Sequence, residues 1–171
     1  MDIQLVQLKN SDFYKIKKVI GNSLDYYEAI ENINQIEIDE EYIKNEVYSF
    51  LEEYSEKKNY CEEHRLGILY EGNIIGVTKF ITEFKIKEQS MIGLLMIDKN
   101  YRKNKVGTET VKLIENILKT KNQSIIKVGV DFKNNIGLNF WRKLDFEKFE
   151  EVKFKHQKNE STVHIFIKQL N

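Results

Sequence analysis

The sequence of 171 residues contains no proline, only one cysteine and no excess of charge of either sign. With Cys61 alone, no disulfide can form within the chain, which fits a reducing compartment. The 27 basic residues are matched by 27 acidic ones, so the chain lacks the uniformly basic composition of proteins that follow nucleic-acid phosphates. We therefore expect no nucleic-acid partner.

Long apolar runs and targeting signals are missing as well. No window approaches the roughly 18 apolar residues that a membrane-spanning helix needs. Residues 1–10 have no basic segment followed by an apolar stretch, which a secretory signal would show. We expect a cytoplasmic protein without a membrane partner.

What the chain does contain is enough apolar surface for one core. Hydrophobic residues make up 41% of it and aromatic residues 12%, and its length is typical of one domain. We expect a single domain over residues 1–171. The sequence leaves open whether this domain is a monomer or a homodimer.

The spacing of apolar residues predicts both helices and strands. Alternation indicates strands and recurrence every three to four residues indicates helices, with residues 25–38 expected to be an irregular or short helical connection. In chain order the elements are a strand at 3–8, a helix at 13–24 capped by Ser11, a helix starting near Asp39, strands at 66–70, 74–82 and 90–97, a helix at 106–118, a strand at 125–130, a helix at 135–144 and a hairpin at 152–156 and 163–168. Hairpins mixed with crossovers predict an α+β (mixed α/β) sheet domain.

The segment from 94 to 108 has the pattern of an anion site. A buried strand ends, a basic loop follows, and a helix begins whose first amides lack intrahelical partners and carry the positive end of the helix dipole. Arg102, Lys103 and Lys105 add positive charge, and Gly107 would let phosphate oxygens approach the backbone. A pyrophosphate fits this pattern, and so does a plain capped turn with solvated lysines.

The same residues resemble the phosphate loop of the Gcn5-related N-acetyltransferase (GNAT) family. That loop reads Arg or Gln, two variable residues, Gly, one variable residue, then Gly or Ala, and here it is Arg102 to Gly107. Lys105 stands where the family has its first Gly, and Lys99 stands near the place of a common Pro. Residues 134–146 resemble the later family motif with the spacing intact, from Asn134 through a small residue to the final Phe.

The resemblance implies a mostly antiparallel sheet splayed at the strand ending near Ile97, with acetyl-CoA in the splay. Backbone groups of 95–97 would pair with the pantetheine, the amides of 102–108 would hold the pyrophosphate, Asn134 would bond the pantetheine arm, and Trp141 would pack in the core and line the thiol end. The implied cofactor residues are Leu95, Met96, Ile97, Arg102, Lys103, Asn104, Lys105, Val106, Gly107, Thr108, Asn134 and Trp141.

The resemblance also implies direct attack of a neutral amine on the thioester, which needs a base and often an acid. The usual acid is a Tyr, but Trp141 occupies its position, and an indole N–H is not a useful acid. Three interpretations remain open: the thiolate leaves unassisted, another Tyr or a water replaces the acid, or the protein binds CoA without turnover. Glu83, directly or through water, is the nominated base, and a solvated turn carboxylate is the alternative.

The acceptor is suggested only by charge. Residues 25–63 hold 13 acidic residues and few lysines, which favours a cationic small molecule or peptide amine, unless these are simply solvated helix faces. The three histidines lack metal-ligand spacing, so we expect no metal. The function is predicted to be acetyl transfer to a primary amine, with a CoA-binding regulatory or scaffold module as the alternative.

Overall fold

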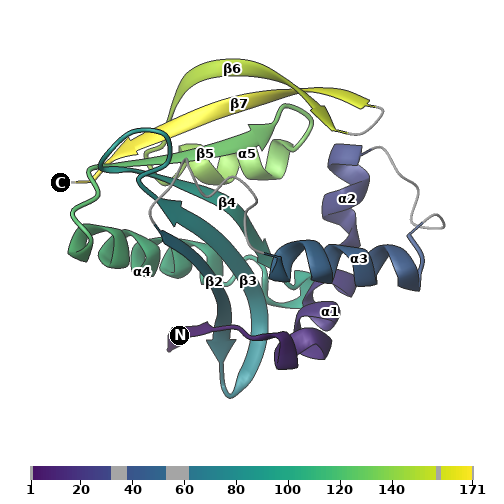
Figure 1. Cartoon of the computed structure of the whole chain (residues 1–171). Coiled ribbons are helices and arrows are strands. Elements are labelled where there is room, and N and C mark those ends of the chain that lie inside the picture. The colour runs from purple at the N-terminus through teal and green to yellow at the C-terminus, as the bar shows by residue number, and fades with distance from the viewer. Residues whose placement is uncertain (1, 32–37, 53–61, 157–158, 171) are drawn as a thin grey trace.

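A seven-stranded sheet forms the centre of the molecule, which is described here from a computed structural model covering residues 2–31, 38–52, 62–156 and 159–170 (Figure 1). The strand order is β1-β2-β3-β4-β5-β7-β6, and only β4 and β5 pair in parallel. The strands are β1 (Ile3–Gln7), β2 (Glu62–Tyr70), β3 (Asn73–Thr82), β4 (Gln89–Ile97), β5 (Ile125–Asp131), β6 (Glu147–His156) and β7 (Asn159–Gln169). The predicted α+β class and mostly antiparallel sheet are confirmed.

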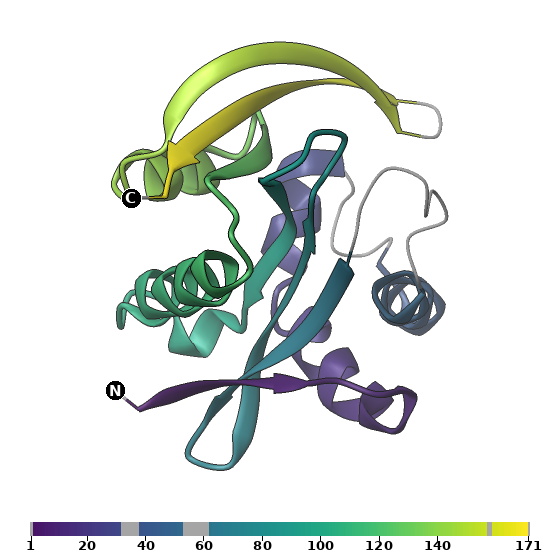
Figure 2. The same ribbon diagram turned by 60° about the vertical axis from the view of Figure 1, so that its left-hand side comes forward.

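Helices cover both faces of this sheet. In Figure 2, α4 lies on one side of β2–β4, and α1 and α3 lie on the other. The helices are α1 (Phe13–Gly21), α2 (Leu24–Glu31), α3 (Glu40–Leu51), α4 (Val106–Thr120) and α5 (Asn135–Arg142), with short 3-10 turns η1 (Asn10–Asp12) and η4 (Lys99–Tyr101). No helix in the described segments is long and apolar enough to cross a membrane.

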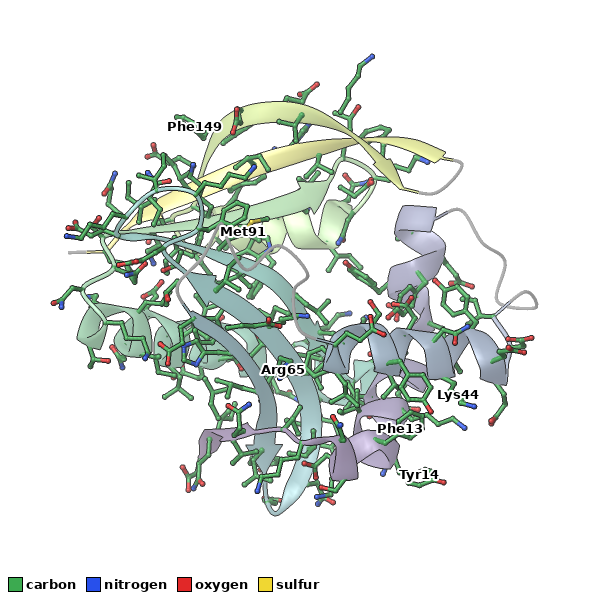
Figure 3. The ribbon with its side chains drawn as sticks, viewed as in Figure 1. Phe13, Tyr14, Lys44, Arg65, Met91 and Phe149 are labelled. Atoms are coloured by element: carbon green, nitrogen blue, oxygen red, sulfur yellow. The ribbon has the colours of Figure 1, made fainter. Side chains whose placement is uncertain are left out.

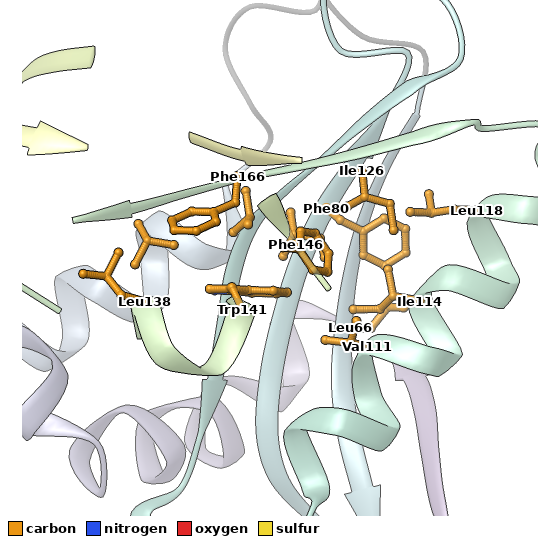
Figure 4. Close-up of a cluster of buried hydrophobic side chains, with 13 residues drawn as sticks. Leu66, Phe80, Val111, Ile114, Leu118, Ile126, Leu138, Trp141, Phe146 and Phe166 are labelled. Atoms are coloured by element: carbon orange, nitrogen blue, oxygen red, sulfur yellow. The ribbon is translucent and has the colours of Figure 1, made fainter. Parts of the chain in front are cut away.

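The core divides between the two faces. Under α4 and α5 the largest cluster includes the fully buried Phe80, Ile114 and Phe166 (Figure 4). On the opposite face a second cluster joins α1, α2 and α3 to β3 and β4 through residues such as Ile16 and Met96. Because apolar side chains are removed from water on both faces, β3 and β4 are held rigidly in the middle of the sheet.

The parallel pair β4–β5 is joined at one end only. Its register runs from Gln89↔Ile125 to Ile92↔Val128 and then stops, although both strands continue. At this point the β3–β4 register shifts, because Lys79 pairs with Leu94 while Phe80 pairs with Ile92, and Gly93 is left as an extra residue. A bulge of this kind bends its strand. The predicted splay is therefore confirmed, and it opens toward the carboxyl ends of β4 and β5.

Several predicted boundaries needed correction. Ser11 does not cap the first helix, because it lies within η1 and Asp12 is the residue that precedes α1. The connection at 25–38, predicted to be irregular or a short helix, begins as the short helix α2, in agreement with the prediction, and residues 32–37 lie outside the described part. Strand β6 begins at Glu147 rather than at 152, since its first residues are charged and exposed and carry no apolar alternation. The cap at Asp39 is confirmed, with Tyr42 N donating to its carboxylate at 2.8 Å.

Candidate functional site: a splayed strand pair beside a phosphate loop

The open half of β4 exposes part of its backbone to the gap. Asp98 N donates to Ile75 O of β3 at 2.9 Å, and alternate residues of an antiparallel strand turn their polar groups the same way. Leu95 and Ile97 therefore face the gap, whereas Met96 turns toward β3, and its side chain is buried. The expectation that Met96 pairs with the pantetheine is corrected by this register.

Of these two residues, Leu95 has the backbone groups with fewer hydrogen bonds to the described chain. The carbonyl of Ile97 already accepts bonds from Ser23 Oγ at 3.2 Å and from Arg102 Nε at 2.8 Å. On the other side of the gap, Gly129 and Asp131 pair with β7 only. An extended chain that entered the gap would meet the unpaired N–H and C=O of Leu95, as an added strand does.

The loop before α4 leaves backbone amides unused. The first intrahelical bond is Glu109 N to Lys105 O at 3.0 Å, so the amides of Val106, Gly107 and Thr108 have no partner among the described residues. Lys105 supplies no side-chain cap. These amides together with the positive end of the α4 dipole suit an anion, so the loop fits a pyrophosphate.

Backbone angles show why glycine is common at one position of this loop. Lys103 and Lys105 have φ values of 66° and 61°, in the left-handed region that residues with a Cβ disfavour. Lys105 occupies the position of the family's first Gly. Its side chain is exposed, as are those of Lys103 and Asn104, so the loop carries positive charge where it opens to solvent.

Gly107 is required for a reason that the sequence did not reveal. A Cβ at this residue would lie 2.9 Å from Phe140 Cε2 of α5 and 3.2 Å from Ile97 Cδ1. Gly107 is buried, and the position that a Cβ would take faces α5 and the end of β4 rather than solvent. The expectation that a side chain here would hold phosphate oxygens away is thus corrected: a side chain would first push α4 from α5.

Asn134 and Gly137 explain the spacing of the second motif. Asn134 is the N-cap of α5, and its Oδ1 accepts from Gly137 N at 2.8 Å. A Cβ on Gly137 would come within 2.8 Å of Asn134 Nδ2, so a side chain three places after the cap would displace the capping residue. The amide NH2 of Asn134 forms no hydrogen bond within the described chain and is left as a donor.

Trp141 lies in the core. It is 5% exposed and makes edge-to-face contacts with Phe140 and Phe146 at centroid distances of 5.0 and 4.9 Å. Figure 4 shows Trp141 beside Phe146. This aromatic packing is the role expected from its sequence context. Its contact with the thiol end of a cofactor stays a prediction.

Glu83 lies at the closed end of the β4–β5 pair. Its backbone N–H donates to Gln123 Oε1 at 3.0 Å, and the next residue donates to Gln89 O at the start of β4. Six residues of extended strand separate Gln89 from Leu95, or about 20 Å at 3.3 Å per residue. This distance argues against Glu83 as the base for chemistry beside Leu95.

A tyrosine–carboxylate pair lies on the face of the sheet that α1, α2 and α3 cover. Tyr27 of α2 is 4% exposed and belongs to the same apolar cluster as Met96. Its hydroxyl is hydrogen-bonded to Glu46 of α3, and burial together with this carboxylate raises the pKa of Tyr27 far above its ordinary value. Sequence reasoning missed this pair, although Tyr26 and Tyr27 are conspicuous within the acidic segment.

The C-terminal end of α3 is fixed to the sheet by two cations. Arg65 Nη1 donates to Leu51 O and Lys79 Nζ donates to Glu52 O at 2.9 Å, where the helix dipole is negative. Figure 3 shows Arg65 on β2 near this helix end. Lys79 also forms an ion pair with Glu63 at 2.9 Å. Part of the charge predicted to attract an acceptor is therefore engaged in structure.

Within the described ranges, no group of three or more His, Cys, Asp or Glu residues could hold a metal ion. The site is thus composed of a gap in the sheet, a loop with free amides, and a wall formed by α2 and α3. The gap and the amides of the loop suit an extended ligand that bears phosphate.

Comparison with known proteins agrees with this interpretation. The model of the acetyltransferase (GNAT) family matches residues 28–146, and the chain belongs to this family. It is an acyl-CoA-dependent N-acetyltransferase with acetyl-CoA as cosubstrate. A search of curated proteins finds no significant match.

Solved structures share the fold over the whole chain. A PaiA N-acetyltransferase from Thermoplasma acidophilum in complex with coenzyme A is similar at 19% identity and a TM-score of 0.70, covering 99% of both chains. An acetyltransferase from Thermus thermophilus is 13% identical with a TM-score of 0.74, covering 99% of this chain and 98% of its own. The ribosomal-protein-S18-alanine N-acetyltransferase from Escherichia coli is 9% identical with a TM-score of 0.62, covering 99% and 95%.

Proposed function

We propose that this enzyme transfers the acetyl group of acetyl-CoA to the primary amine of a small cationic molecule or peptide, by direct attack in a ternary complex. The observation that carries the proposal combines a strand edge at Leu95 with three amides at the start of α4, none of which has a partner in the described part of the chain. An extended pantetheine and a pyrophosphate are the two chemical groups that would use both.

The cosubstrate residues follow from this placement. Backbone groups of Leu95 would bond the pantetheine, and the Asn134 amide would donate to it. The residues of the phosphate loop would hold the pyrophosphate through amides of the 102–108 segment, with Lys103 and Lys105 adding charge. Trp141 would close the thiol end from the core. The arrangement uses backbone donors whose positions are fixed before binding, which lowers the cost of ordering the ligand.

The chemistry needs one proton acceptor and a carbonyl held in place. The amine nitrogen forms a bond to the acetyl carbon, the carbon–sulfur bond breaks, and the electron pair leaves on sulfur. A thiolate with an ordinary pKa of about 8.5 is a tolerable leaving group at neutral pH, so the missing Tyr is not essential. Positioning and backbone donors near the thioester carbonyl supply much of the acceleration.

We assign to Glu46 the role of general base that the sequence suggested for Glu83. It lies on α3 and bonds the hydroxyl of Tyr27, which packs in the cluster over the open half of β4. We assign it the proton of the attacking ammonium, received directly or through water. Its carboxylate also provides a counter-charge for a cationic acceptor held beside α2.

The preference for a cationic acceptor rests on the carboxylates of α2 and α3. Asp25 and Glu40 have cationic partners within the protein, but Glu28 and Glu41 form no ion pair within the described segments. Their field attracts amines of positive charge and repels acidic ones. The remaining acidic residues between 53 and 61 lie outside the described structure.

Release of CoA thiol from acetyl-CoA, measured with a panel of cationic, neutral and anionic amines at low and high salt, tests the proposal. We expect turnover with cationic amines, with a kcat/KM that falls as salt screens the attraction. Indifference to acceptor charge would remove the cationic preference. Tight CoA binding without thiol release for any amine would leave only a CoA-binding module.

A further inference from the structure

We propose that Arg102 and Asp25 form a strut that couples occupation of the phosphate loop to the position of α2, which forms a wall of the acceptor site. The inference rests on the proposed function, since it concerns how the two substrate sites communicate. It gives Arg102 the role of a positioning residue instead of a direct phosphate ligand.

The guanidinium of Arg102 is engaged in three directions. Nε donates to Ile97 O at 2.8 Å, Nη2 donates to Asp25 Oδ1 at 3.1 Å, and Nη1 donates to Asp25 Oδ2. This is a bidentate ion pair, which fixes the orientation of the guanidinium and the carboxylate as well as the distance between them. The Arg102 side chain is 27% exposed and that of Asp25 41%, so the bidentate geometry and not burial gives the pair its specificity.

Three parts of the site meet at this one side chain. Ile97 is the last residue of the splayed half of β4, Arg102 is the first residue of the phosphate loop, and Asp25 lies in the first turn of α2. In sequence, Asp25 and Arg102 are 77 positions apart. A shift of the loop therefore moves the start of α2 unless this pairing breaks.

Neighbouring contacts strengthen the same junction. Asn22 Nδ2 donates to Asp98 Oδ2 at 2.7 Å, and Lys99 N donates to Asn22 O at 3.3 Å. Ser23, which is fully buried, donates to Ile97 O at 3.2 Å. Because Asp98 is itself 4% exposed, its bond to Asn22 is protected from water. The α1–α2 junction is thus bound to the residues that flank the phosphate loop.

The helix that is fixed in this way carries the acceptor-side pair. Tyr27 follows Asp25 by two residues and holds Glu46 of α3 by its hydroxyl. A ligand that orders the loop through the amides of Val106, Gly107 and Thr108 would therefore also order α2 and, through Tyr27, the proposed base. Coupling between two sites requires an element that both sites bias, and α2 with its strut is that element.

Hydrogen–deuterium exchange with and without CoA tests this coupling. In the wild type we expect CoA to slow exchange at the phosphate loop and, by about fivefold or more, in α2, as typical coupling energies give. In Asp25→Ala the loop should still be protected by CoA, but the protection of α2 should be lost. Arg102→Lys keeps the positive charge but cannot form the bidentate pair, and it should likewise reduce the CoA-induced protection of α2.

The matched control is Glu28→Gln, which removes one carboxylate charge from the same helix without touching Arg102, and it should keep the CoA-induced protection of α2. Equal protection of α2 in Asp25→Ala and the wild type would overturn the strut. So would protection of the loop alone in the wild type. If CoA protects neither segment in the wild type, CoA binding itself fails, and the strut falls with the proposed function. Thermal unfolding of each variant shows whether it is folded.

Discussion

Lys105 keeps a left-handed backbone conformation directly before α4, with φ of 61° and ψ of 7°. A residue with a Cβ pays a strain of about 1 kcal/mol or more in that conformation. In the same place, the exposed Lys105 side chain adds a positive charge next to the amides at the start of α4. The family more often has glycine at this position, which avoids the strain. This chain has a strained residue with a cationic side chain there instead.

Replacing Lys105 separates these two effects. Lys105→Gly should raise the free energy of unfolding by up to about 1 kcal/mol, because glycine adopts this conformation without strain. Lys105→Ala keeps the Cβ and should not stabilise the protein. Both variants should bind CoA more weakly at low salt, since both lose the charge. Urea unfolding and CoA titrations measure these quantities, and a Gly variant no more stable than the Ala variant would count against the strain.

The assignment of the base is tested by replacing two carboxylates, Glu46 on α3 and Glu83 after β3. Glu46→Gln should lower kcat about 100-fold or more, the usual loss when a general base is removed. Glu83→Gln should leave kcat within about twofold, because Glu83 lies at the closed end of the strand pair, far from the gap. Steady-state kinetics with one cationic amine decides between them. The reverse pattern would restore Glu83 and exclude Glu46.

At the scale of elements, the site depends on how closely α4 and α5 approach. Gly107 of α4 has Phe140 of α5 where its Cβ would be, and Gly137 of α5 has the Asn134 cap and Val130 in the same relation. The second motif is therefore a packing and capping motif as much as a binding motif. It fixes the start of α5, directly after β5.

Gly107→Ala should destabilise the fold by about 1–3 kcal/mol, the usual cost of an added methyl in a tightly packed place. Shortening the neighbour in Gly107→Ala/Phe140→Leu should recover part of the loss, because the Cβ then meets no aromatic ring. Chemical denaturation of the two single variants and the double variant measures this coupling. Simple additivity of the single effects would contradict the contact.

Much of the element order follows from apolar spacing, because amphipathic segments such as α4 and β4 carry it clearly. The basic loop and helix start before α4 could likewise be predicted from charge, glycine and the strand–helix pattern, and phosphate binding there stays a prediction. Three features could not: the orientation of Met96, the remoteness of Glu83 and the neighbour of Gly107. Each depends on register between strands or on contact between helices far apart in sequence, which local patterns do not encode.

At the scale of the whole molecule, the ion pair between Glu62 of β2 and Lys121 at the end of α4 lies beside a group that responds to pH. His64 on β2 stacks on Phe80 at 4.6 Å and is 15% exposed. Burial lowers the pKa of His64 from its ordinary value of 6.5, although the nearby Glu62 opposes the shift. Lys121, at the end of α4, is paired with the same Glu62 and also disfavours the imidazolium.

The sign of the pH effect follows from this lowered pKa. Between the folded pKa and 6.5 the unfolded chain binds a proton that the folded protein does not, so stability falls as pH drops below about 6.5. The melting temperature of the wild type should decrease between pH 7 and pH 5 more than that of His64→Gln. The lowered pKa of Glu62 acts only below its ordinary value of 4.5, outside this window. Parallel profiles for the two proteins would show that His64 makes no contribution.

The central claim is that acetyl-CoA occupies the gap between β4 and β5, with its phosphates at the start of α4. A crystal structure of the protein with CoA tests this most directly. The claim predicts backbone hydrogen bonds from Leu95 to the pantetheine, and pyrophosphate oxygens on the amides of Val106, Gly107 and Thr108. CoA bound elsewhere on the surface, with the gap closed by pairing of β4 and β5 beyond Ile92, would contradict it.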